Sequence, residues 1–180
     1  METITIQIFK DDVYKEVAKA TDYTGSKLMG GDEKARDRIL ATDSELADLG
    51  RFWEESVLAT NERLKQMLVL GETKQVMTTG VSGKTSETAA QDQSPISPVP
   101  IGEKKTAYVA KLEVSKSFDK ELTANVQSAL RNYFITSIIG QWFKFANKDE
   151  AADYFNQASE MMDGAERLLY SRKKPTRPSD

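Results

Sequence analysis

The apolar cluster between residues 134 and 145 is the stretch that most constrains the fold. At about 100° per residue, its large apolar side chains project over roughly 180° of a helix, whereas an ordinary amphipathic helix needs about 100°. We expect this helix to run from a cap at Ser117 to about Phe145. It is therefore either central and packed from both sides, or it packs a second face against another subunit. The cluster comprises Phe134, Ile135, Ile138, Ile139, Trp142, Phe143 and Phe145.

The N-terminal part of the chain contains shorter helical signals. Asp11 or Asp12 is expected to cap a short helix that precedes a loop at residues 23–25. A second short helix is predicted over residues 32–41. Thr42 and Glu45 then form a capping box for a helix of roughly 26 residues, or about 39 Å.

The last predicted helix restarts after Asn147 and ends near Tyr170. Its apolar residues recur at helical spacing, so we expect one face to be buried. That face comprises Ala151, Phe155, Ala158, Met162, Ala165 and Leu169.

Two regions alternate between apolar and polar residues, as half-buried strands do. The first is N-terminal, and the second, over residues 106–118, is expected to pair with residues 67–79. The predicted fold class is mainly α: an elongated helical bundle with a small β component, formed by the N-terminal strand and a long-tipped hairpin arm. The inward residues are Ile4, Ile6 and Ile8 in the first region and Tyr108, Ala110, Leu112 and Val114 in the second.

Composition divides the chain into one domain and an arm. Residues 1–79 and 105–170 are expected to form a single helical-bundle domain. Residues 80–104 contain three Pro, three Gly and four Ser. This stretch cannot alone bury enough apolar surface to offset its ordering entropy, and a long loop of this kind is often a binding arm.

A basic tail, residues 171–180, ends the chain. Pro175 and Pro178 exclude a helix there. The tail is either a solubilising end or a peptide arm that docks on an acidic neighbour, for which the acidic helix over residues 43–63 of a second copy is a candidate. Its basic residues are Arg172, Lys173, Lys174 and Arg177.

The composition excludes several kinds of chemistry. The chain has no cysteine and no histidine. Disulfides, thiolate nucleophiles, Cys/His zinc sites and histidine-based triads are therefore impossible. With 25 basic and 28 acidic residues, the net charge of −3 favours no general attraction to nucleic acid or to anionic membranes. No apolar run reaches 18 residues and no secretory signal is recognisable, so we expect no membrane partner.

Two local patterns resemble functional motifs but have simpler explanations. Residues 83–85 read Gly-Lys-Thr, as at the end of a phosphate-binding loop, but Thr78 stands where the first glycine is required and no helix signal follows. Glu54 and Glu55 are adjacent, so they point about 100° apart and form a solvated acidic face. We therefore expect no enzyme, no cofactor and no metal.

Short strings throughout the chain resemble the head-tail connector (adaptor or neck) proteins of tailed bacteriophages, specifically virion proteins of phages of gut Bacteroidetes. The order of helices, the hairpin arm and the basic proline-containing tail agree with this resemblance. The arm is longer than in compact adaptors. The strings lie at residues 23–25, 38–43, 52–55, 117–119 and 169–178.

The resemblance implies a homo-oligomeric ring, usually of twelve copies, between the portal and tail or neck proteins. It implies a location in the virion neck, assembly in the host cytoplasm, and a lumen that passes DNA without reading its sequence. With the wide apolar helix and the basic tail, it assigns subunit or partner contacts to Phe134, Ile138, Trp142, Arg172, Lys173, Lys174 and Arg177.

Two alternatives remain from the sequence. The chain could be a tail completion protein or another virion protein of the neck. It could instead belong to a different class, a small helical adaptor or regulatory protein of the cell that binds one partner through the arm.

Overall fold

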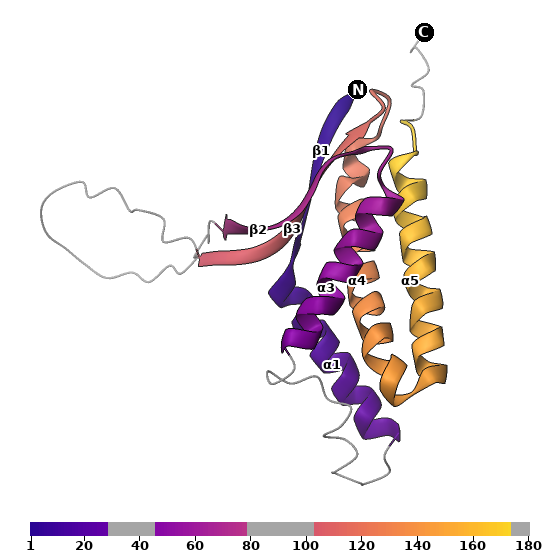
Figure 1. Ribbon diagram of the computed structural model, residues 1–180. Coiled ribbons are helices and arrows are strands. Elements are labelled where there is room, and N and C mark those ends of the chain that lie inside the picture. Colours follow the sequence, from indigo (N-terminus) through magenta and orange to yellow (C-terminus); the bar gives the residue numbers. More distant parts are fainter. Residues whose placement is uncertain (29–45, 79–102, 174–180) are drawn as a thin grey trace, which may run out of the picture.

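A computed structural model describes residues 1–28, 46–78 and 103–173 of the 180-residue chain (Figure 1). These residues are mostly helical, with the helices gathered on one side of a small sheet. The predicted fold class is confirmed. The elements are β1 (Glu2–Phe9), α1 (Lys10–Leu28), α3 (Leu46–Arg63), β2 (Leu68–Thr78), β3 (Glu103–Val114), a 3-10 helix (Lys120–Leu122), α4 (Thr123–Ala146) and α5 (Lys148–Leu169).

The sheet is antiparallel, with strand order β1-β3-β2. Ile4 pairs with Leu112, and Ile8 pairs with Tyr108. Because side chains alternate between the faces of a strand, the residues predicted to point inward all lie on one face, against the helices. They are buried, which confirms the predicted inner face of both strands.

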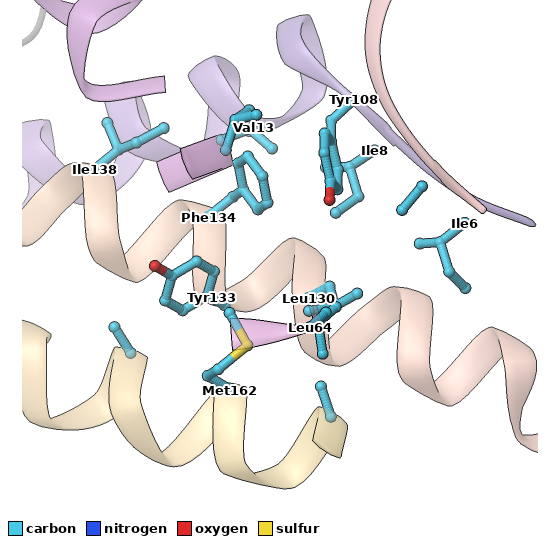
Figure 2. Packing of buried hydrophobic residues seen from close by; sticks show 14 of the residues in the cluster. Ile6, Ile8, Val13, Leu64, Tyr108, Leu130, Tyr133, Phe134, Ile138 and Met162 are labelled. Carbon is cyan, nitrogen blue, oxygen red and sulfur yellow. The ribbon is translucent and has the colours of Figure 1, made fainter. Parts of the chain in front are cut away.

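Helix α4 is the centre of the molecule. It contacts α5, α1, α3 and β1. Figure 2 shows how neighbouring residues of α4 serve opposite sides: Tyr133 points towards Met162 of α5, whereas Phe134 points towards Val13 of α1 and Tyr108 of β3. The wide apolar arc of this helix is therefore explained by packing on both sides within one chain.

The loop predicted at residues 23–25 is wrong, because α1 continues through Tyr23, Thr24 and Gly25 to Leu28. Thr21 lies in the buried face, and its hydroxyl donates to the carbonyl of Val17 (3.0 Å). A single glycine costs a helix only about 1 kcal/mol, which tertiary packing can outweigh.

Helices α3 and α4 differ from their predicted bounds. As described, α3 has 18 residues and ends at Arg63, before a turn that leads into β2. Ser117 does not cap α4. Its carbonyl accepts from the N–H of Lys173 (2.7 Å), and Asp119 instead caps the 3-10 helix that precedes α4.

The predicted inner face of α5 is wrong at one residue, Phe155. Phe155 is 39% exposed, whereas the other five residues of that face are buried. Its ring lies against the backbone of α4 at Gly140, where an added Cβ would be 3.1 Å from the ring. The ring therefore covers the margin of the α4–α5 contact and not its interior.

Several predicted features lie outside the described residues. They are the helix over 32–41, the capping box at Thr42 and Glu45, the glycine-lysine-threonine string at 83–85, most of the 80–104 arm, and the tail from residue 174.

Gly71 of β2 is expected to tolerate no side chain. A Cβ there would lie 2.2 Å from Oδ1 of Asn61. Asn61 donates to the Gly71 carbonyl (3.1 Å) and accepts from the buried Tyr108 hydroxyl (2.8 Å). Gly71→Ala displaces Asn61 and leaves the Tyr108 hydroxyl without its acceptor. We therefore expect a loss of about 2–3 kcal/mol in the free energy of unfolding.

Urea denaturation measures this loss, and Gly50→Ala is the matched control. Gly50 lies within α3, and nothing surrounds its Cβ position within 4 Å. This control is expected to stabilise the protein by about 0.5–1 kcal/mol. Equal effects of the two substitutions would contradict the arrangement around Asn61.

Candidate functional site

The predicted contact residues of α4 lie at different depths. Phe134 and Ile138 are 0% exposed, enclosed entirely by their own chain. In this fold neither side chain is available to a second subunit. Trp142 is partly buried at the margin of the core. Phe145, at the end of the same helix, is 79% exposed.

The basic tail begins at one end of the molecule. The backbone of Arg172 bridges to Phe118, and Lys173 donates to Ser117. These contacts hold the start of the tail beside the turn between β3 and α4, near the N-terminus (Figure 1). The side chains of Arg172 and Lys173 are exposed. Lys174 and Arg177 lie outside the described residues.

A groove runs between α3 and α5, with α4 as its floor. Its larger part has a volume of about 800 Å³. A second hollow of about 410 Å³ adjoins it, because Phe155 lines both. Aromatic and apolar groups line the larger part, among them Ala59, Tyr133, Phe155, Ala158, Met162 and Tyr170. The smaller part reaches Phe52, Gln141 and Phe145.

An ion-pair cluster crosses one end of this groove. Arg63 at the end of α3 contacts Asp163 and donates from Nε to Glu166 Oε1 of α5 (2.6 Å). The hydrogen bond to Glu166 raises the pKa of Arg63. Since Arg63 and Asp163 are about half exposed, the cluster contributes little stability, and it links the two walls of the groove at this end.

The carboxylates along the groove are paired with basic residues. Glu62 contacts Lys65 (2.5 Å), and Glu55 lies 3.9 Å from Arg51. Burial raises the pKa of Tyr133, so its phenol stays protonated at neutral pH.

The acidic residues that the structure describes do not gather into a metal site. Within residues 1–28, 46–78 and 103–173, no three of them are placed to hold an ion. The larger part of the groove combines the rings of Tyr133, Phe155 and Tyr170 with polar and charged residues, a mixture of the kind found where proteins meet.

The hairpin of β2 and β3 extends beyond the rest of the sheet. The last pair between β1 and β3 is Phe9 with Ala107, whereas β3 continues to pair with β2 as far as Glu103 with Thr78. Residues 75–78 and 103–106 thus form a two-stranded ribbon that projects from the body (Figure 1). Met77 on this ribbon is exposed.

The groove, and the exposure of Phe145 and Phe155 in it, were not predicted from the sequence. One signal was available for Phe155. The face of α5 towards α4 carries Ala151, Ala158 and Ala165 at intervals of seven residues. Small residues let two helices approach closely, which leaves less room for a large ring between them.

Comparison with known proteins gives no relative. The chain matches no family model, no curated protein and no solved structure. Among the described helices, none combines the length and apolar character needed to cross a membrane.

Proposed function

We propose that this chain is a structural virion protein, a head-to-tail connector that forms a ring between the portal and the tail of a tailed bacteriophage. The observation that carries the proposal is the ribbon of β2 and β3, which continues past the body of the molecule. The 24 residues between its strands, 79–102, are rich in Pro, Gly and Ser. A projecting element of this kind reaches a neighbouring layer without disturbing the core.

The proposed lateral contact of the ring uses the groove between α3 and α5. Phe145 and Phe155 expose aromatic surface there, and aromatic residues are enriched where proteins meet. Phe134 and Ile138 take no part in the proposed contact because their own chain covers them. Trp142 stays in the proposed contact, together with Arg172 and Lys173 for an adjacent layer.

The proposed ring has twelve copies, lies in the neck of the virion and is assembled in the host cytoplasm. Double-stranded DNA passes through its lumen without sequence recognition. A net charge of −3 agrees with this role, because a lumen that must release DNA cannot bind phosphates strongly. Such a subunit catalyses no reaction and needs no cofactor.

Two other functions agree with parts of the same structure. A tail completion protein would use the ribbon in the same way but in a different layer. A cellular adaptor is favoured by the groove itself, whose volume of about 800 Å³ and aromatic lining suit a helix from one partner. The two classes differ in location, since only a virion protein is retained in purified particles.

Shortening the arm tests the proposed function. Removing residues 84–100 leaves β1, β3 and the helices untouched, so we expect the melting temperature to change by no more than about 2 °C, the size of a sub-kilocalorie effect. Incorporation into particles, measured by immunoblotting of purified virions, is expected to fall at least about tenfold.

A chain with residues 84–100 scrambled separates the effect of length from that of sequence. Normal incorporation of the shortened chain would refute the docking role of the arm. A large fall in melting temperature would show that the arm belongs to the folded core.

A further inference from the structure

Strand β1 forms one edge of the sheet. Its neighbour on one side is β3, and in the part of the chain that the structure describes no strand pairs with its other side. In an antiparallel ladder, alternate residues point their N–H and C=O groups away from the neighbouring strand. β1 therefore presents a row of backbone donors and acceptors to its outer side.

The two edges of this sheet differ in the features that discourage pairing with another chain. β2, at the opposite edge, has a register shift between Leu68 and Leu70, followed by Gly71 and the charged Glu72 and Lys74. Bulges and charged residues are devices that block such pairing. Between Thr3 and Phe9, β1 has no charge, no glycine and no proline. In the described part of the chain, the β2 edge therefore carries features that discourage pairing, and the β1 edge carries none of them.

We propose that β1 pairs antiparallel with β1 of a second copy, around a two-fold axis at Ile6, so that one continuous sheet spans both copies. This register places Ile4 opposite Ile8 of the second copy and Thr5 opposite Gln7 of the second copy. All isoleucines then stay on the face that packs against the helices. A shift by one residue would turn the second copy over, so that the helices of the two copies would lie on opposite faces of the joined sheet. An axis at Ile6 pairs the whole uncharged segment 3–9 with itself.

The charges of β1 favour its own sequence as the partner. A two-fold pairing brings equivalent segments together, so a charged strand would meet its own charge. β1 avoids this repulsion, because residues 3–9 carry no charge and Glu2, its one charged residue, pairs with Lys120 of its own chain (3.1 Å). On the outer face, Thr5 and Gln7 form a polar cross-strand pair of the kind that stabilises sheets.

This pairing goes beyond the connector proposal and does not depend on it. A ring with cyclic symmetry has no two-fold axis between neighbouring copies. The dimer is therefore a state of the free chain, which covers its open edge until assembly. A failure of dimerisation leaves the virion location untouched, and an absence from virions leaves the dimer untouched.

A charge placed on the outer face of β1 tests the pairing in the full chain. Thr5 is exposed and lies opposite Lys111 of β3, so Thr5→Glu gains an attractive neighbour within its own chain. In the dimer, the two introduced glutamates lie diagonally across the axis and repel each other. By sedimentation velocity, we expect a dimer for the wild type and a dissociation constant raised about tenfold by Thr5→Glu. At a dilution where both chains are monomeric, we expect no loss of melting temperature.

A second substitution tests the register. Adding Gln7→Lys to Thr5→Glu places opposite charges across the axis, and we expect it to restore the dimer. The matched control is Gln75→Lys, an exposed position on the β2 edge, which should leave the dimer unchanged. A monomeric wild type, an oligomer that Thr5→Glu leaves intact, or dissociation caused by Gln75→Lys and not by Thr5→Glu would each overturn the proposal.

Discussion

Replacement of Ile138 by aspartate is expected to unfold the protein. Ile138 is fully buried on α4, the helix that contacts α1, α3, α5 and β1. The substitution removes a core side chain and places a carboxylate where nothing can solvate it. We expect a loss of about 5 kcal/mol or more, which equals or exceeds the whole stability of many domains. Circular dichroism during thermal and urea unfolding measures it.

The matched control for this prediction lies two turns further along α4. Phe145→Asp makes a similar change, from a large apolar side chain to a carboxylate, but at an exposed position. Its effect on stability is expected to stay within about 0.5 kcal/mol, while the proposed lateral contact is lost. A cooperatively folded Ile138→Asp protein with near-normal stability would contradict the central position of α4.

Truncation of Trp53 is expected to have the second-largest effect. Its indole is fully buried beside the ring of Phe134, with 4.8 Å between ring centroids, and its Nε1 donates to Oγ1 of Thr73 (3.0 Å). Trp53 thus joins α3 to α4 and to β2. Trp53→Ala leaves a large cavity at this junction and removes that hydrogen bond, so we expect a loss of about 3–5 kcal/mol in the free energy of unfolding.

Trp142→Ala provides the comparison for Trp53→Ala in the same urea denaturation measurements. Trp142 is the other tryptophan of the chain, and it is only partly buried at the margin of the core. Truncation of Trp142 removes less buried surface, so it should lower the free energy of unfolding clearly less than Trp53→Ala does. If the two substitutions lowered the free energy of unfolding equally, the assignment of Trp53 to the centre of the core would be wrong.

The sequence was most informative where one periodicity dominates a long segment. The alternation of Ile4, Ile6 and Ile8 predicts which face of β1 is buried, and the structure confirms it. The wide apolar arc of α4 also predicts a helix packed on two sides. The arc alone cannot tell whether the second layer comes from the same chain or from another subunit. Helix α5 supplies that layer on the side of Tyr133, whereas Phe134 packs against Trp53 of α3 and Tyr108 of β3 on the other side.

Features that depend on distant segments could not be predicted from the sequence. The groove exists because α3 lies beside α5, and its end is crossed by the ion pair of Arg63 and Glu166, residues that are 103 positions apart. The helical state of residues 23–25 depends on tertiary packing of the buried Thr21 and Thr24, which overrides the local turn signal. The start of α4 also differs from its local signal, because a 3-10 helix capped by Asp119 precedes it and the Ser117 hydroxyl bonds to Ser115 instead.

The location of this chain in purified virions is the most direct test of its role as a connector. Electron microscopy of particles decorated with an antibody against the chain would provide it. The connector account predicts label at the single vertex where the tail joins the head, with many copies in each particle. Particles that lack the chain, while it persists in infected cells as a soluble protein bound to one partner, would contradict the account.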